Sequence, residues 1–298
     1  MISTSELQRR LTGGEPPVLV HVLPEDAFRE ARIPASLNLC VYETAFLDKA
    51  GDRIPDRATP VVVYSLDGSG EEADEARRQL LAAGYLAVEV LEGGLAAWQA
   101  AGGVVEGDAP EPQSAPDGRF VADLEQSVIR WTGRNLFNHH HGTVRLASGS
   151  AVLARGSVVS ARFAVDLHSI RCEDIADAGA NASLLAHLAS GDFFCTGEHP
   201  RAEFVAHVVE GIAGATPGCP NYRVAGDFTL RGVTAPLDFP AVVALAPDGS
   251  ISVQAEFAID RTRWGSRYGS GRFFNRLGRH VVNDHIGLHL KIRLLPEG

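Results

Sequence analysis

Three groups of residues in this 298-residue sequence carry the side chains that chemistry or ligand binding requires. The first is histidine: His139, His140 and His141 stand in a row, and His285 and His289 lie near the C-terminus. Imidazole nitrogens are ligands for Zn, Cu, Ni or Fe. On a strand His139 and His141 share one face, as do His285 and His289, so these four are the candidate metal ligands.

The second group is the stretch 260–279, DRTRWGSRYGSGRFFNRLGR, in which six arginines accompany one acidic residue and several aromatic rings. Its glycines predict a long loop at a hairpin tip. Guanidinium groups beside aromatic rings suit a phosphate or carboxylate headgroup, or an anionic membrane surface, and we assign this role to Arg267, Arg272 and Arg276. The alternative is a solvated loop whose arginines pair with the acidic N-terminal half.

The third group is a glycine-containing loop that follows the apolar run 60–64, PVVVY. Loops of this kind can direct backbone N–H groups at an anion beside a helix N-terminus. The residues concerned are Ser65, Asp67, Gly68 and Gly70.

Strands and helices alternate in the first part of the chain. Short apolar runs predict buried strands at 17–22, 60–64 and 88–91, and helical spacing predicts helices at 24–32, 71–83 and 95–101. Such alternation indicates a parallel sheet covered on both faces. Residues 108–118 continue a Pro- and Gly-rich stretch that predicts a linker, so we assign 1–107 to a first domain and 119–298 to a second.

The second domain shows period-two alternation, which predicts an antiparallel barrel or sandwich interrupted by one short helix at 181–188. In 158–167 the apolar set is Val159, Ala161, Phe163, Val165 and Leu167, and 284–294 alternates in the same way. His285 and His289 lie opposite the apolar row of that last strand. The candidate ligand-lining residues are Trp131, Phe163, Val165, Leu167, Phe193, Phe194, Phe204, Phe228, Phe257, Ile286 and Leu288.

Composition and charge exclude several classes of protein. Apolar residues make up 45% and charged residues 21%, which argues against a disordered chain, and no apolar run is long enough for a transmembrane span. Residues 1–117 carry 9 basic and 20 acidic residues, whereas 118–298 carry 18 and 17, so we expect no nucleic-acid partner. Four cysteines without a CxxC pair, and no secretory signal at the N-terminus, predict a cytoplasmic protein.

Residues 17–107 resemble the rhodanese-like fold, through VLVHVLPEDAFREARIPASLNL (18–39), VVVYSLDGSG (61–70) and LEGGLAAW (91–98). Active members of that family carry a sulfur-transferring cysteine and an arginine in the loop after the VVVY-type strand. Here those positions are Ser65 and Gly70, and His21 stands where the family usually has Asp. The resemblance therefore implies a domain without sulfurtransferase activity that serves in docking or regulation.

Residues 120–294 resemble the YceI-like, polyisoprenoid-binding family, through HGTV (141–144), LLAHLASGDFFCTGEHPRAEF (184–204), YRVAGDFTLRGVTAPL (222–237) and FAIDRTRWG (257–265). This resemblance implies a lipocalin-like barrel whose cavity takes a quinone tail or polyprenyl lipid.

We therefore expect a carrier or sequestering protein for an isoprenoid-type lipid, with a protein partner bound through the rhodanese-like domain, or a homodimer. The sequence assigns no resident cofactor. Two alternatives remain: a metal-dependent enzyme that uses the barrel histidines, and a stress-response scaffold without a small ligand.

Overall fold

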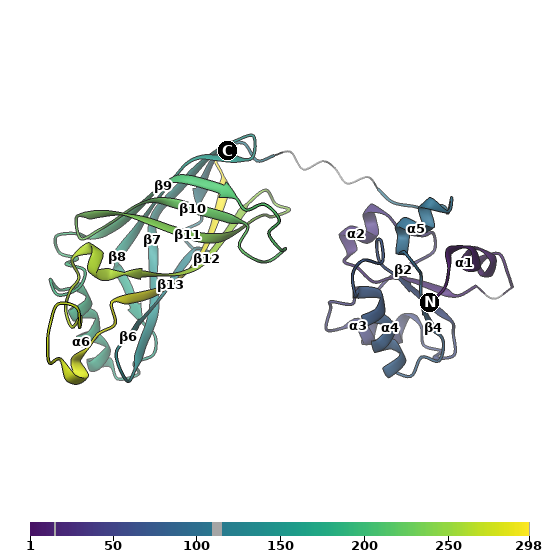
Figure 1. Cartoon of the computed structure of the whole chain (residues 1–298), viewed down its shortest axis with the longest axis horizontal. Helices are drawn as coiled ribbons and strands as arrows, with labels where there is room; N and C mark the ends of the chain where they lie inside the picture. Colours follow the sequence, from purple (N-terminus) through teal and green to yellow (C-terminus); the bar gives the residue numbers. More distant parts are fainter. Residues whose placement is uncertain (15, 109–114, 298) are drawn as a thin grey trace. The chain divides into compact units, whose positions relative to one another are not determined.

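A computed structural model describes residues 1–14, 16–108 and 115–297 of the chain (Figure 1). The chain divides into two compact units, Met1–Gln113 and Ser114–Gly298. Of the predicted linker at 108–118, residues 109–114 lie outside the described part of the chain. Each unit is described by itself below.

The first unit is built on a parallel four-stranded sheet in the order β2-β1-β3-β4. The strands span β1 Val18–His21, β2 Leu37–Asn38, β3 Val61–Tyr64 and β4 Val88–Val90. All four residues of β3 are buried, because Val61 and Val63 face one apolar cluster while Val62 and Tyr64 face another. Burial on both faces explains why this strand is a continuous apolar run.

The described residues of this unit also form the helices α1 Thr4–Leu11, α2 Glu25–Glu30, α3 Phe46–Arg53, α4 Glu72–Ala82 and α5 Gly94–Ala100, which cover the sheet. The predicted α/β architecture is confirmed, with α1, β2 and α3 as additions. The two-residue β2 is too short to show a period in the sequence. Residues before the linker also belong to this unit, because Arg32 bridges to Glu106 and the Trp98 indole donates to the Val104 carbonyl at 2.8 Å.

The second unit is a closed antiparallel barrel, as the sequence predicts (Figure 1). Its sheet runs β12-β11-β10-β9-β8-β7, and the pairing of β12 with β13 closes it. β5 and β6 both lie between β7 and β13, one after the other, so the nine strands of residues 115–297 fill eight positions around the barrel. The strands are β5 Gly118–Ala122, β6 Val128–Arg134, β7 His139–Ala154, β8 Ser157–Cys172, β9 Arg201–Gly211, β10 Tyr222–Leu230, β11 Val233–Leu245, β12 Ile251–Asp260 and β13 His285–Pro296.

One predicted inward residue of β8 faces outward instead. Leu153 pairs with Val158 and Val152 with Ser160, so Val159 is the extra residue of a β-bulge. Its side chain is 66% exposed, while Ala161, Phe163, Val165 and Leu167 pack inward as the alternation predicts. The bulge places Val159 on the outer face, and the predicted alternation holds from Ala161 to Leu167.

One end of the barrel is covered by irregular structure and a helix. Helix α6, Ala178–Ala189, is capped by the Asp177 carboxylate, which accepts from the Ala180 N–H. A short 3-10 turn, η1 Arg261–Trp264, precedes the loop from 265 to 284, which we call the arginine loop, and a second one, η2 Gly278–His280, lies within it. Among the described residues, none of the helices has the length and apolar character needed to cross a membrane.

Candidate functional site

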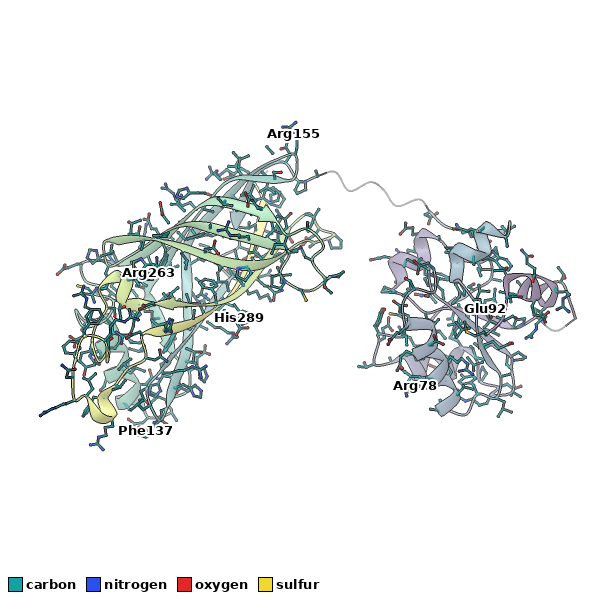
Figure 2. The ribbon with its side chains drawn as sticks, viewed as in Figure 1. Arg78, Glu92, Phe137, Arg155, Arg263 and His289 are labelled. Atoms are coloured by element: carbon teal, nitrogen blue, oxygen red, sulfur yellow. The ribbon has the colours of Figure 1, made fainter. Side chains whose placement is uncertain are left out.

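A cavity of about 680 Å³ lies inside the barrel. Its wall includes Pro116 and Gly156 at the end where β7 turns into β8, and Arg134 and His280 at the end that carries α6. Figure 2 labels Arg155 and Phe137, which mark these two ends. The cavity therefore runs along the barrel rather than across it.

The structure places all eleven candidate ligand-lining residues on this wall. Strand alternation puts Phe163, Val165 and Leu167 of β8 there, while Phe193 and Phe194 come from the segment after α6. Trp131, Phe204, Phe228, Phe257, Ile286 and Leu288 come from β6, β9, β10, β12 and β13. Whether a ligand touches them remains a prediction.

Further aromatic rings, not among the sequence-based candidates, add to the wall. Phe239 of β11 stacks on Phe257 with ring centroids 4.2 Å apart, and lies 5.6 Å from the Phe204 ring. Small residues, among them Ala161, Ala202 and Ala206, leave the space that the rings do not fill. Apolar rings beside small side chains leave an apolar channel inside the barrel.

The polar side chains of the wall gather at the α6 end. We call this group the polar rim: Arg134, Asn135, His140, His187, Arg261, Tyr268, Arg279, His280 and Asn283. Outside the rim, the described wall residues offer polar side-chain atoms only on Trp131 and Tyr222, and the Trp131 indole already donates to the Arg171 carbonyl. The cavity thus has one polar end and a long apolar body.

Arg261 organises the polar rim. It is 1% exposed, and its guanidinium donates to the carbonyls of Ser266, Tyr268, Val282 and Asn283 at 2.7–3.2 Å. Burial lowers the pKa of Arg261, against the opposing effect of the nearby Asp284 and Asp260 carboxylates. A planar fork of five donors can satisfy four carbonyls at once, so this residue fixes both ends of the arginine loop.

His187 is a second rim residue that the sequence did not single out. Its ring lies edge-on to Phe193 at 4.9 Å and to Tyr268 at 4.6 Å, and its Nε2 is 3.0 Å from an Asp192 carboxylate oxygen. His187 belongs to the rim because it lies on the side of α6 that faces the cavity. A single histidine in a short helical segment does not indicate which side of the helix faces a cavity.

The three predicted headgroup arginines lie outside the cavity wall. Arg272 is paired with Asp260 at 3.0 Å and Asp284 at 3.6 Å. Arg267 is exposed and stacks over Phe273 at 4.7 Å, and Arg276 is exposed with a φ of 59°. The arginines that do line the cavity are Arg134, Arg261 and Arg279.

The four predicted metal ligands are not brought into one site. His139 and His141 are stacked, with centroids 5.9 Å apart, on the exposed face of β7. His285 and His289 are exposed on β13, which is separated from β7 at this level by β6. His140, between the two stacked rings, turns to the cavity side instead.

The glycine-containing loop after β3 carries neither a cysteine thiol nor an arginine side chain, because Ser65 and Gly70 stand at those positions. Ser65 is 3% exposed, and Asp67 bends over the loop to accept from the Ser69 N–H at 3.0 Å and its hydroxyl at 2.7 Å. These Ser69 hydrogen bonds hold the pKa of Asp67 below its ordinary value. Gly68 has a φ of 70°, and a Cβ at Gly70 would lie 2.1 Å from a Glu72 carboxylate oxygen. The loop therefore presents carboxylates where a bound persulfide would need positive charge.

Family comparisons agree with both halves of this architecture. The family model described as YceI-like domain matches residues 120–294, and the one described as rhodanese-like domain matches residues 3–101. Both resemblances drawn from the sequence are thereby confirmed.

Individual relatives match only part of the chain. The "uncharacterized protein YibN" of Escherichia coli is 35% identical over 89 residues, which is 30% of this chain and 60% of YibN. The crystal structure of Burkholderia cenocepacia BcnA is 19% identical, covering 58% of this chain and 98% of BcnA with a TM-score of 0.45. A Saccharophagus degradans structure described as a polyisoprenoid binding domain is 16% identical, covering 62% of this chain and all of that one, with a TM-score of 0.45.

Proposed function

This chain belongs to the YceI-like domain family through residues 120–294, and from that premise we propose that its barrel carries an isoprenoid-type lipid. The observation that supports the proposal is the polarity of the cavity. A body lined by apolar side chains ends in a single polar rim, which matches a lipid with a long hydrocarbon tail and one polar head.

The length of the cavity fits a polyprenyl tail. On β8 the lining residues run from Val158 to Ile170, twelve steps along the strand. At about 3.3 Å per residue and a strand tilt of about 40°, this corresponds to roughly 30 Å along the barrel axis. A slender chain of several isoprene units spans that distance, whereas a compact hydrophobe would fill only part of it.

Burial of the tail supplies the free energy of binding. Each 100 Å² of apolar surface removed from water contributes about 2.5 kcal/mol, and ordering the tail offsets part of this. The polar rim gives orientation, because its clustered polar side chains can donate hydrogen bonds to a quinone or phosphate head, whereas the rest of the described wall carries polar side-chain atoms only on Trp131 and Tyr222.

A calorimetric titration of the delipidated full chain tests the proposal. A quinone with a polyprenyl tail should bind with sub-micromolar affinity, and the same quinone without its tail should bind at least 100-fold more weakly. Ala206→Trp should abolish binding, since Ala206 lines the cavity, while Ala258→Trp on the exposed outer face of β12 should leave it unchanged. Equal affinity for the two quinones would contradict a tail-binding carrier.

We assign the rhodanese-like unit a docking or regulatory role, supported by the missing thiol at Ser65 and the carboxylates around its loop. The protein is proposed to work in the cytoplasm, where its four free cysteines stay reduced. Cross-linking of the full chain in cells, followed by identification of the peptides joined to residues 1–101, tests the docking role. Cross-links confined to residues 120–294 would contradict it.

A further inference from the structure

Three metal-ligating side chains meet at the α6 end of the barrel, none of them among the four histidine ligands expected from the sequence. They are His140 on β7, Cys172 at the end of β8, and Asp174 in the segment that leads to α6. One ligand atom from each lies within 4.8 Å of the other two. The His140 Nδ1 is 2.8 Å from one Asp174 oxygen, and the Cys172 thiol donates to the other at 3.3 Å.

The backbone holds these side chains together. Cys172 pairs with Gly142 across the two strands, and a Cβ at Gly142 would lie only 1.8 Å from the Arg171 carbonyl oxygen. Only glycine therefore lets β7 approach the end of β8 so closely. The approach brings His140, two residues before Gly142, beside the Cys172 side chain.

Asp174 is fixed from both sides. Its carboxylate accepts the His141 backbone N–H at 2.8 Å. The segment before α6 is held by the Asn181 amide, which donates to the carbonyls of Cys172 and Ile175 at 3.0 Å each. Positioned donors of this kind are what orient the ligands of a metal site.

We propose that His140, Cys172 and Asp174 bind one Zn²⁺ ion, or another divalent ion that accepts thiolate, imidazole and carboxylate together. Zinc bonds of about 2.3 Å to sulfur and about 2.0–2.2 Å to nitrogen and oxygen place tetrahedral ligand atoms roughly 3.3–3.7 Å apart. The Cys172–Asp174 separation of 3.3 Å already matches this spacing. The His140 Nδ1 lies 2.8 Å from the other Asp174 oxygen and has to move away by about half an ångström to reach the same spacing.

When the ion binds, metal–ligand bonds replace the hydrogen bonds that Asp174 forms with His140 and Cys172, and the charges of the ion and its ligands cancel. The Cys172 S–H bond breaks, its electron pair goes to the metal, and its proton goes to solvent. Imidazole coordinates as the neutral base and the Asp174 carboxylate as the anion, so the ion and its two anionic ligands form a neutral unit. A fourth position remains for water on the cavity side, because His140 is itself part of the cavity wall.

The three side chains differ in solvent exposure, and the most exposed of them gives an ion access to the site. The Cys172 side chain is buried, the Asp174 side chain is 20% exposed and the His140 ring is 38% exposed. The thiolate would thus lie on the sheltered side of the ion and the imidazole on the open side. His141 offers a further nitrogen, since its Nδ1 lies 3.9 Å from an Asp174 oxygen.

Titration of the reduced full chain with Co²⁺ tests the site. The wild-type chain should bind one equivalent and show the charge-transfer absorption of a cobalt–thiolate bond, and Zn²⁺ should displace the Co²⁺ and remove that band. Cys172→Ser should lose the band, and His140→Gln and Asp174→Asn should weaken binding at least 100-fold. Cys219→Ser, which changes an exposed cysteine elsewhere, and His139→Gln, on the outer face of β7, are the matched controls and should bind as the wild type does.

Two results would overturn the site. One is wild-type protein without a charge-transfer band at one equivalent of Co²⁺. The other is one-equivalent binding that persists in Cys172→Ser but is lost in His139→Gln, which would assign the ion to the exposed histidines. Far-UV circular dichroism of each variant establishes that it is folded, and the nearly isosteric Asp174→Asn keeps the test valid if a strand variant fails to fold. The probes are bare metal ions, so the outcome is independent of lipid binding.

Discussion

The Arg261 guanidinium lies 5.4 Å from the centre of the Phe193 ring, and both groups form part of the cavity wall at its polar end. The buried Arg261 guanidinium is held in place both by the Phe193 ring and by the four carbonyls to which it donates. The polar rim is therefore a built part of the barrel rather than a loose loop laid over it.

Replacing Arg261 should destabilise the barrel. Arg261→Met leaves four carbonyls without their donor and removes the ion-pair partner of the Asp284 carboxylate, and we expect a loss of about 3–5 kcal/mol in the free energy of unfolding by urea. Arg267→Ala, an exposed arginine of the same loop, should change it by less than about 1 kcal/mol. Similar small losses for both variants would show that Arg261 does not hold the rim.

Strand periodicity explains why the inner face of the barrel is predictable. Side chains alternate from Ala161 to Leu167 of β8 and from Ile286 to Leu294 of β13, so the apolar row of each segment can be assigned to the inner face from the residue pattern alone. The assignment fails at Val159 because a bulge adds one residue, and nothing in a run of Val and Ser residues signals a bulge.

The rim is less predictable because loops have no period. Arg261 and Arg272 are alike in the sequence, yet one is buried under four carbonyls and the other pairs with two carboxylates. Likewise, strand alternation predicts that His140 lies on the opposite face of the strand from His139 and His141. Which of the two faces lines the cavity depends on how the sheet closes into a barrel, and the three histidines alone do not indicate it. Cys172 and Asp174 join His140 through pairing of distant segments, which no local pattern records.

Sulfurtransferase activity should be absent from the first unit. Thiocyanate formation from thiosulfate and cyanide by the full chain should not exceed that of Ser65→Ala, because a hydroxyl cannot carry the transferred sulfur. Ser65→Cys should add little, since Asp67 and the acidic first turn of α4 oppose a persulfide anion. Turnover by the wild-type chain well above the Ser65→Ala level would contradict this interpretation.

The rhodanese-like unit should lose stability in mild acid through His21. This side chain is fully buried between the Phe28 and Tyr64 rings, and burial lowers its pKa from 6.5 to about 4. Between pH 6.5 and about 4 the unfolded chain therefore binds a proton that the folded chain does not, so stability is fully present above pH 6.5 and falls as the pH drops.

At about 1.4 kcal/mol per pH unit, the loss at pH 5 should be roughly 2 kcal/mol. Hydrogen exchange of the β3 amides in the full chain measures it, and His21→Leu should remove most of the difference between pH 7 and pH 5. An unchanged pH dependence in His21→Leu would assign the effect to other groups.

The exposed arginines of the arginine loop should promote loading from anionic membranes. Arg267 and Arg276 have no carboxylate within salt-bridge distance among the described residues, and the nearby Phe273 and Phe274 are 43% and 48% exposed. At about 1 kcal/mol per arginine near an anionic surface, changing both to Ser should weaken vesicle binding about 30-fold and flatten its salt dependence.

Arg145→Ser with Arg162→Ser, two exposed arginines on the strands β7 and β8, is the matched control. Sedimentation with phosphatidylglycerol vesicles gives the affinity, and phosphatidylcholine vesicles show how much of it is electrostatic. Arg272 is excluded from the test variant because its pairing with Asp260 and Asp284 gives it a structural role. Equal losses in the test and control variants would mean that total charge, not the arginine loop, governs binding.

The most direct test of the carrier proposal is native mass spectrometry of the full chain, expressed in its own source organism and purified without detergent. The account predicts a one-to-one adduct whose mass, after extraction and fragmentation, shows the five-carbon repeat of an isoprenoid tail, and the Ala206→Trp variant should carry none. Wild-type protein that carries no adduct, like Ala206→Trp, would contradict the claim that the cavity holds such a lipid.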